Sequence, residues 1–124
     1  MKYFYLTIFT FLTFANAHAE WTWSVESDDG STFAIDFASI RDKGEYRYAW
    51  VKGVFPLGKI PNVRSIKELY KVDCAIYKFR PERRTVYEDV DASKNPIIVP
   101  PESDYLFPQP GSLLYALLDD ICKK

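Results

Sequence analysis

The sequence is short of the residue types that most often carry out catalysis. Its 124 residues contain one histidine, His18, and two cysteines, Cys74 and Cys122. His18 lies in an N-terminal segment that we expect to be removed, so the mature chain cannot build a Ser-His-Asp or a Cys-His arrangement. Two cysteines are too few for a four-ligand zinc site. The sequence therefore predicts no catalytic residue, no metal site and no cofactor.

Other shortages exclude further classes of protein. Sixteen basic and seventeen acidic residues give a formal net charge of −1, without the basic excess of a general nucleic-acid-binding protein. The longest apolar run, Tyr3 to Phe14, covers about twelve residues, whereas a membrane-spanning helix needs roughly 20. We therefore expect neither a nucleic-acid partner nor an integral membrane segment in the mature chain.

Residues 1–19 have the pattern of a secretory signal peptide. Lys2 supplies the positive start, the apolar run follows, and Ala17-His18-Ala19 fits the small-x-small cleavage pattern, with cleavage after Ala17 as an alternative. No cysteine lies near the cleavage point for lipid attachment. We expect a single domain over residues 20–124, located in the periplasm or secreted.

Alternation of apolar and polar residues predicts several half-buried strands. They cover residues 21–26, 31–36, 45–55, 64–79 (one strand, or two with a bend near Asp73 and Cys74) and 84–90. The alternation places Cys74 on the buried face of its strand. Residues 37–40 are expected to form a short helical turn or a corner, and residues 80–83 a turn that contains Pro81.

The C-terminal part changes character. Residues 91–111 hold five of the eight prolines and have no periodicity, which indicates an extended loop. A helix is expected to begin after Ser112, its cap. Its apolar stripe also carries Cys122; the other members are Leu114, Leu117, Leu118 and Ile121.

The two cysteines are predicted to form a disulfide. Each lies on a face expected to be buried, and an exported chain with an even number of cysteines oxidises them. The spacing is unlike the Cys-x-x-Cys of a reactive redox pair. A Cys74–Cys122 bridge would fasten the last helix to the sheet.

Charge is unevenly distributed along the chain. Residues 20–45 carry a net charge of −5, residues 46–84 one of +7 and residues 85–124 one of −4. Attraction between neighbouring strands is one explanation, and a basic face that meets an anionic partner is the other.

Two groups of residues are candidates for contacts with a partner. The densest basic cluster surrounds the turn expected at residues 80–83; it serves either solubility or docking to an acidic protein segment, a glycosaminoglycan or a phospholipid head group. The aromatic residues of 45–55, with Trp21 and Trp23, provide more aromatic surface than a small core needs. The candidates are Lys78, Arg80, Arg83, Arg84, Tyr46, Tyr48 and Trp50.

Three segments, in this order, resemble the surface-adhesin protein E-like domain of Gram-negative bacteria. They are WSVESDDGSTFAIDFASI with the following YRYAWV, then RSIKELYKVDC, and the closing DDIC. The resemblance covers nearly all of residues 21–123. It implies an α+β fold, with a predominantly antiparallel sheet of five to six strands. A C-terminal helix would pack on one face and be linked to the sheet by the disulfide, often in a homodimer.

The resemblance also implies a function. Its namesake adhesin binds extracellular-matrix glycoproteins of the host, so we expect a non-catalytic exported binding domain with a protein or polyanionic glycan partner. The alternative is a periplasmic inhibitor or accessory subunit of an enzyme or envelope complex, which would insert the 91–111 loop. A third hypothesis, an enzyme, would require the carboxylates of that loop to converge in a cleft.

Overall fold

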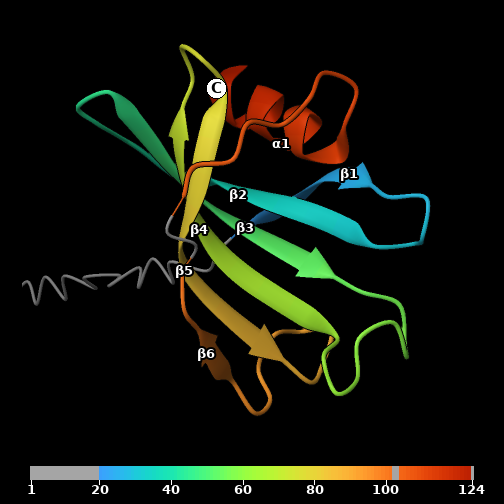
Figure 1. Ribbon diagram of the computed structural model, residues 1–124. Helices are drawn as coiled ribbons and strands as arrows, with labels where there is room; N and C mark the ends of the chain where they lie inside the picture. The colour runs from blue at the N-terminus through green and yellow to red at the C-terminus, as the bar shows by residue number, and fades with distance from the viewer. Residues whose placement is uncertain (1–19, 102–103, 124) are drawn as a thin grey trace, which may run out of the picture.

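The computed structural model of the chain describes residues 20–101 and 104–123, so the predicted signal peptide lies outside the described residues. Six strands form one antiparallel sheet in their sequence order, and one helix follows them (Figure 1). The elements are β1 (Trp21–Glu26), β2 (Thr32–Lys43), β3 (Tyr46–Val54), β4 (Ser65–Asp73), β5 (Lys78–Tyr87), β6 (Ile97–Val99) and α1 (Leu113–Lys123). The predicted fold class is confirmed.

The sheet is a meander, in which each strand pairs with the next one along the chain. Short turns join β1 to β2, β2 to β3 and β4 to β5, and a longer loop, residues 55–64, joins β3 to β4. The turn between β1 and β2 contains Asp29-Gly30, a dipeptide typical of hairpin turns, and Gly30 adopts a φ of 89° there. Asp29 accepts a hydrogen bond from the backbone N–H of Ser31 at 2.8 Å, which closes the turn.

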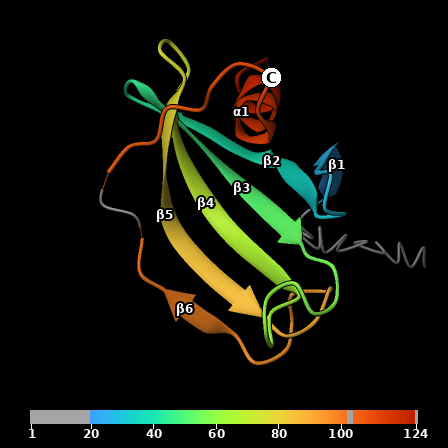
Figure 2. The same cartoon turned by 45° about the vertical axis from the view of Figure 1, so that its right-hand side comes forward.

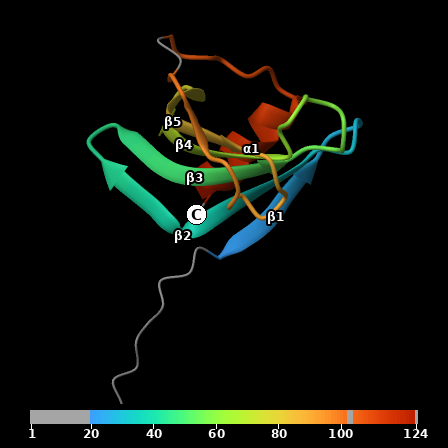
Figure 3. The ribbon, with the colours of Figure 1, turned by 90° about the horizontal axis from the view of Figure 1, so that it is seen from below.

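The corner expected at residues 37–40 is a bend inside β2, and the alternative prediction of a helical turn there is wrong. The pairing of β2 with β3 shifts between Asp36 and Arg41, and Figure 3 shows the strand turning sharply on its way to the β2–β3 hairpin. The Ser39 hydroxyl accepts the Trp50 N–H at 3.0 Å and donates to the Asp36 carbonyl at 2.6 Å. These two bonds satisfy backbone groups that the bend removes from the ladder.

The prediction of a turn at residues 80–83 is wrong, because these residues lie within β5. The chain reverses direction just after β4 instead, where Asp73 accepts the N–H of Ala75 at 3.0 Å and Tyr77 adopts a φ of 49°. Pro81 lies within β5, beside an irregularity in its pairing with β4. Such an irregularity tolerates a proline, which has no N–H to donate to the ladder, so the proline did not mark a turn.

The segment 91–111 is more ordered than an extended loop. It contains β6, which pairs with residues 84–86 of β5. Further along, Leu106 and Phe79 exchange two backbone hydrogen bonds of 3.0 and 2.8 Å. Residues 97–99 and Leu106 therefore lie along the outer edge of β5, and the periodicity failed to reveal β6 because the strand has only three residues.

The helix α1 covers one face of the sheet at its β1–β2 side (Figure 2). Ser112 caps it as predicted, since its hydroxyl accepts the Tyr115 N–H at 3.2 Å. The buried helix residues Leu117, Leu118 and Ile121 pack into one core with sheet residues. The sheet contributes Ile35, Ala49, Val51, Tyr70, Val72 and Phe79.

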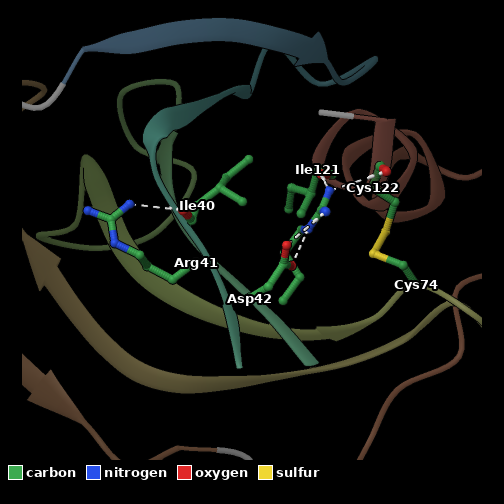
Figure 4. A network of polar contacts seen from close by, with 7 residues as sticks. Ile40, Arg41, Asp42, Cys74, Ile121 and Cys122 are labelled. Carbon is green, nitrogen blue, oxygen red and sulfur yellow. Dashed lines mark hydrogen bonds and ion pairs between the residues drawn. A yellow bond between two sulfur atoms is a disulfide. The ribbon is translucent and has the colours of Figure 1, made fainter. Parts of the chain in front are cut away.

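The predicted disulfide is confirmed. Cys74, directly after β4, bonds Cys122 near the end of α1, with their Cα atoms 5.6 Å apart (Figure 4). The same end of the helix is held by Arg47 of β3, whose guanidinium donates to the carbonyls of Ile121 and Cys122 at 3.0 and 3.3 Å. A cation at this position complements the negative end of the helix dipole.

Candidate binding face

The face of the sheet opposite α1, called the open face below, collects the polar side of three central strands. On β3 the residues Ala49 and Val51 point into the core beneath α1, so Tyr48 and Trp50 point the opposite way. Residues directly opposite each other on neighbouring strands share a face. The register therefore identifies the residues of β4 and β5 that share the open face: Ser65, Lys67, Leu69, Lys71, Asp73, Lys78, Arg80, Arg83, Thr85 and Tyr87.

The structure brings six of the seven predicted contact residues to this face. Tyr46, Tyr48 and Trp50 come from β3, and Lys78, Arg80 and Arg83 come from β5. The exception is Arg84, which lies on the side of α1. There its Nε atom is 3.1 Å from the carboxylate of Glu68, and both side chains are largely buried.

A hollow of about 440 Å³ opens on this face where β2 bends. Tyr48, Trp50 and Leu69 supply aromatic and aliphatic surface, and cations from two sides surround it. The remaining lining residues are Ser39, Arg41, Lys43, Glu82 and Arg83. A hollow with an aromatic wall and a cationic rim suits a ligand that combines apolar surface with negative charge.

A second group of aromatic residues, Tyr46 and Tyr105, lies beside the hollow. The rings of Tyr46 and Tyr105 stack with centroids 6.0 Å apart. Three cations surround the Tyr105 ring: Lys78 at 4.5 Å, Arg80 at 5.0 Å and Lys71 at 5.8 Å from its centroid. Cation–π contacts hold these long side chains in place without neutralising their charge.

Several groups at the hollow have no polar partner of their own. In the part of the chain that the structure describes, no ion pair or side-chain hydrogen bond engages Lys43, Arg83, the Tyr48 hydroxyl or the Trp50 indole. Arg41 uses its Nη1 atom to donate to the carbonyls of Ala38 and Ile40 at 3.0 and 2.9 Å. The hollow therefore offers free donors to a ligand.

Like charges also meet directly on the open face. Lys52 of β3 lies opposite Lys67 of β4. Partial burial and the charge of Lys67 lower the pKa of Lys52, and the nearby carboxylates of Asp91 and Asp89 partly oppose this shift. Interaction with the Tyr105 hydroxyl, by contrast, raises the pKa of Lys71, which therefore keeps its proton at neutral pH. Like charges directly opposite each other, such as Lys52 and Lys67, destabilise the pairing of their strands unless negative charge compensates them.

Negative charge on this face is sparse. Glu82 accepts a hydrogen bond from Arg80 at 2.7 Å, and Asp73 binds a backbone amide of its own turn. Asp36, opposite Trp50, is buried to 8% exposure, and its Oδ1 atom has no hydrogen-bond partner. The cations of β2 to β5 therefore outnumber the carboxylates, and most of their charge stays available.

The site is suited to binding. Among residues 20–101 and 104–123, no group of three His, Cys, Asp or Glu side chains could hold a metal ion. Of the three carboxylates in the 91–111 segment, Asp91 and Asp104 are exposed and Glu102 lies outside the described residues. Within the described ranges, no helix is long and apolar enough to cross a membrane.

Sequence reasoning missed part of this face. Lys67 and Lys71 stood at polar positions of a predicted strand, and knowledge of the strand register would have placed Lys71 beside Tyr48. Tyr105 had no signal, because it lies in the aperiodic segment and reaches the face only through the pairing of Leu106 with Phe79.

A disulfide-fastened helix on one face of a sheet, with an aromatic and basic surface left open on the other, defines a binding module. The family model of surface-adhesin protein E matches residues 21–123. The chain therefore belongs to the surface-adhesin protein E family and is a surface-adhesin-like binding domain. Membership implies an exported or surface-located binding protein rather than an enzyme.

Solved structures support the same fold. A structure of Haemophilus influenzae protein E in crystal form II is similar with a TM-score of 0.64 and 16% identity, over 87% of this chain and 91% of that chain. A crystal structure of protein E from non-typeable Haemophilus influenzae gives a TM-score of 0.59 and 16% identity, over 88% and 79%. Among curated protein sequences, none matches this chain.

Proposed function

We propose that the open face is the surface through which this exported, non-catalytic domain attaches to its partner, and that the partner presents negative charge there. One observation carries the proposal: six candidate residues chosen from separate parts of the sequence share one face. Binding sites are enriched in aromatic residues and arginine relative to the rest of a protein surface. The same two kinds of residue line the hollow.

The partner we favour is an extracellular-matrix glycoprotein, in keeping with the adhesin family. Of the two expected locations, the periplasm and the medium, this partner requires the medium, since the outer membrane separates the periplasm from host tissue; no cysteine near residue 19 could carry a lipid. The homodimer implied by the family resemblance stays a prediction, to be checked by analytical ultracentrifugation of the mature protein.

The test removes charge from the hollow without removing structure. Lys43→Ala/Arg83→Ala takes away two cations that have no intramolecular partner among the described residues. The matched control, Lys59→Ala/Lys123→Ala, removes the same charge elsewhere, where Lys59 pairs with Asp29 and Lys123 with Asp119. Attachment to an immobilised basement-membrane matrix is then compared with that of the parent.

We expect the hollow variant to bind about tenfold more weakly, since it lacks two charge-assisted contacts, while the control binds like the parent. Raising the ionic strength should weaken the parent more than the hollow variant. Equal binding by the parent and both variants would show that the attachment surface lies elsewhere.

A further inference from the structure

The cations of the open face are arranged as a track. Reading across β4 and β5, one row contains Lys67, the next Arg83, and the third Lys71 opposite Arg80. Lys78 extends the series at the start of β5, where it lies opposite Asp73. Rows on one face are two residues apart, roughly 7 Å along the strands. The track thus carries cations over a span of roughly 20 Å, with Glu82 paired to Arg80 and Asp73 opposite Lys78 as the carboxylates beside it.

Aromatic rings accompany this track along β3. Trp50 lies in the row of Leu69 and Arg83, Tyr48 lies in the row of Lys71, and Tyr46 follows against Tyr105. Tyr48 lies directly opposite Lys71, and Lys71 lies 4.2 Å from the Tyr46 ring centroid. Trp50 lies between Leu69 and Asp36, and Arg83 follows beyond Leu69. A row of aromatic rings on β3 therefore runs beside the cations of β4 and β5.

We infer that this track binds a linear sulfated glycosaminoglycan, with sulfate and carboxylate groups on the cations and a pyranose ring against Trp50 in the hollow. The inference deepens the proposed function, on which it rests, by naming the partner's chemistry. A sugar ring presents C–H groups on its faces, which the electron-rich face of an aromatic ring attracts. Its anionic substituents lie around the edge of the ring, where they reach the neighbouring guanidinium and ammonium groups.

An acidic peptide matches the observations less well. Peptide N–H and C=O groups need hydrogen-bond partners, and the face of a sheet, unlike its edge, has no free backbone groups to pair with them. A glycosaminoglycan carries its polar groups on hydroxyl, sulfate and carboxylate substituents instead.

The experiment compares three soluble polyanions by calorimetric titration of the mature, oxidised protein at 0.1 M salt. Heparin is linear, sulfated and carboxylated; hyaluronan is linear and only carboxylated; poly-L-glutamate carries carboxylates on a peptide backbone. We expect heparin to bind at least about tenfold more tightly than either of the others, and to weaken as salt is added. Equal affinity for poly-L-glutamate would overturn the inference in favour of an acidic protein segment.

Two variants test the contributions of the aromatic ring and of the cations separately. Trp50→Ala removes the ring without changing the charge and should weaken heparin binding about tenfold. The control is Leu57→Ala, which truncates an exposed side chain in a loop away from the open face and should not change heparin binding. Lys67→Ala/Arg83→Ala provides a second variant and should lower the salt dependence as well as the affinity. Unchanged heparin affinity in both open-face variants would overturn the inference.

The two proposals can fail separately. If the matrix assay depends on Lys43 and Arg83 but heparin does not bind, the open face remains the attachment surface and its ligand is not a glycosaminoglycan. If heparin binds through Trp50 but the matrix assay is unaffected by the hollow variant, the glycan site stands and the proposed attachment function falls.

Discussion

Removing the Cys74–Cys122 bridge should cost this domain about 4 kcal/mol of stability. The bridge closes a loop with a sequence separation of 48 residues. In the chain-entropy model, opening a loop of that length gives the unfolded chain enough freedom to lower the free energy of unfolding by about 4 kcal/mol at 25 °C. Small domains have a total of about 5–15 kcal/mol, so the bridge is a large part of what keeps the domain folded.

The native fold should nevertheless survive in Cys74→Ala/Cys122→Ala. Leu117, Leu118 and Ile121 remain fully buried against the sheet, and Arg47 still binds the last helix carbonyls. The helix therefore stays docked by apolar burial, at about 2 kcal/mol for each such side chain. We expect an unchanged far-ultraviolet circular dichroism spectrum at low temperature.

Urea unfolding monitored by tryptophan fluorescence measures the effect. With a slope of about 1–2 kcal/mol per molar, typical of a small domain, the midpoint should fall by roughly 2–4 M. The slope itself should rise, because an unfolded chain without the cross-link exposes more surface. Parent protein treated with a reductant is the control and should match the variant. A loss under about 1 kcal/mol with an unchanged slope would refute the loop-entropy reasoning.

Two further predictions concern packing and pH. Gly53→Ala should destabilise the domain by about 1–3 kcal/mol, because a Cβ there would lie 2.9 Å from the Phe33 ring and 3.1 Å from the Ile66 side chain. Urea unfolding measures this loss. A variant as stable as the parent would show that these side chains can move aside. The hydrogen bond from the Tyr77 hydroxyl to Asp119, 2.6 Å long, raises the pKa of Tyr77 to about 12. Since this is above the value of about 10 in the unfolded chain, the bond stabilises fully below pH 10 and is lost as the pH rises towards 12. Tyr77→Phe should therefore reduce the fall in unfolding free energy between pH 9 and 12, and an identical fall in both proteins would contradict the assignment.

Much of this architecture was readable from local patterns. The alternation of β1 to β4, the apolar stripe of α1 and the Ser112 cap depend on residues close in sequence, so a short window contains the information. The disulfide could be predicted because Cys74 and Cys122 continue two such patterns.

The turn between β4 and β5 shows where local patterns fail. Pro81 is a turn signal in isolation, yet the partner strand accommodates it through a shift in register. Similarly, β6 is too short for a periodic signal and forms only because β5 offers it an edge. The accommodation of Pro81 depends on pairing with β4, and the formation of β6 depends on pairing with β5. A short window of sequence around either feature does not contain its partner strand.

The sequence by itself determined that this chain carries a buried face, a capped helix and a pair of cysteines able to join them. Only the tertiary structure decided which cations lie together. Side chains on a regular strand alternate, so Arg80 and Arg83, three residues apart, would point to opposite faces. The extra residue in β5, Glu82, reverses the alternation and brings both to the open face. The register of three strands, which no single segment encodes, then places them beside Tyr48 and Trp50.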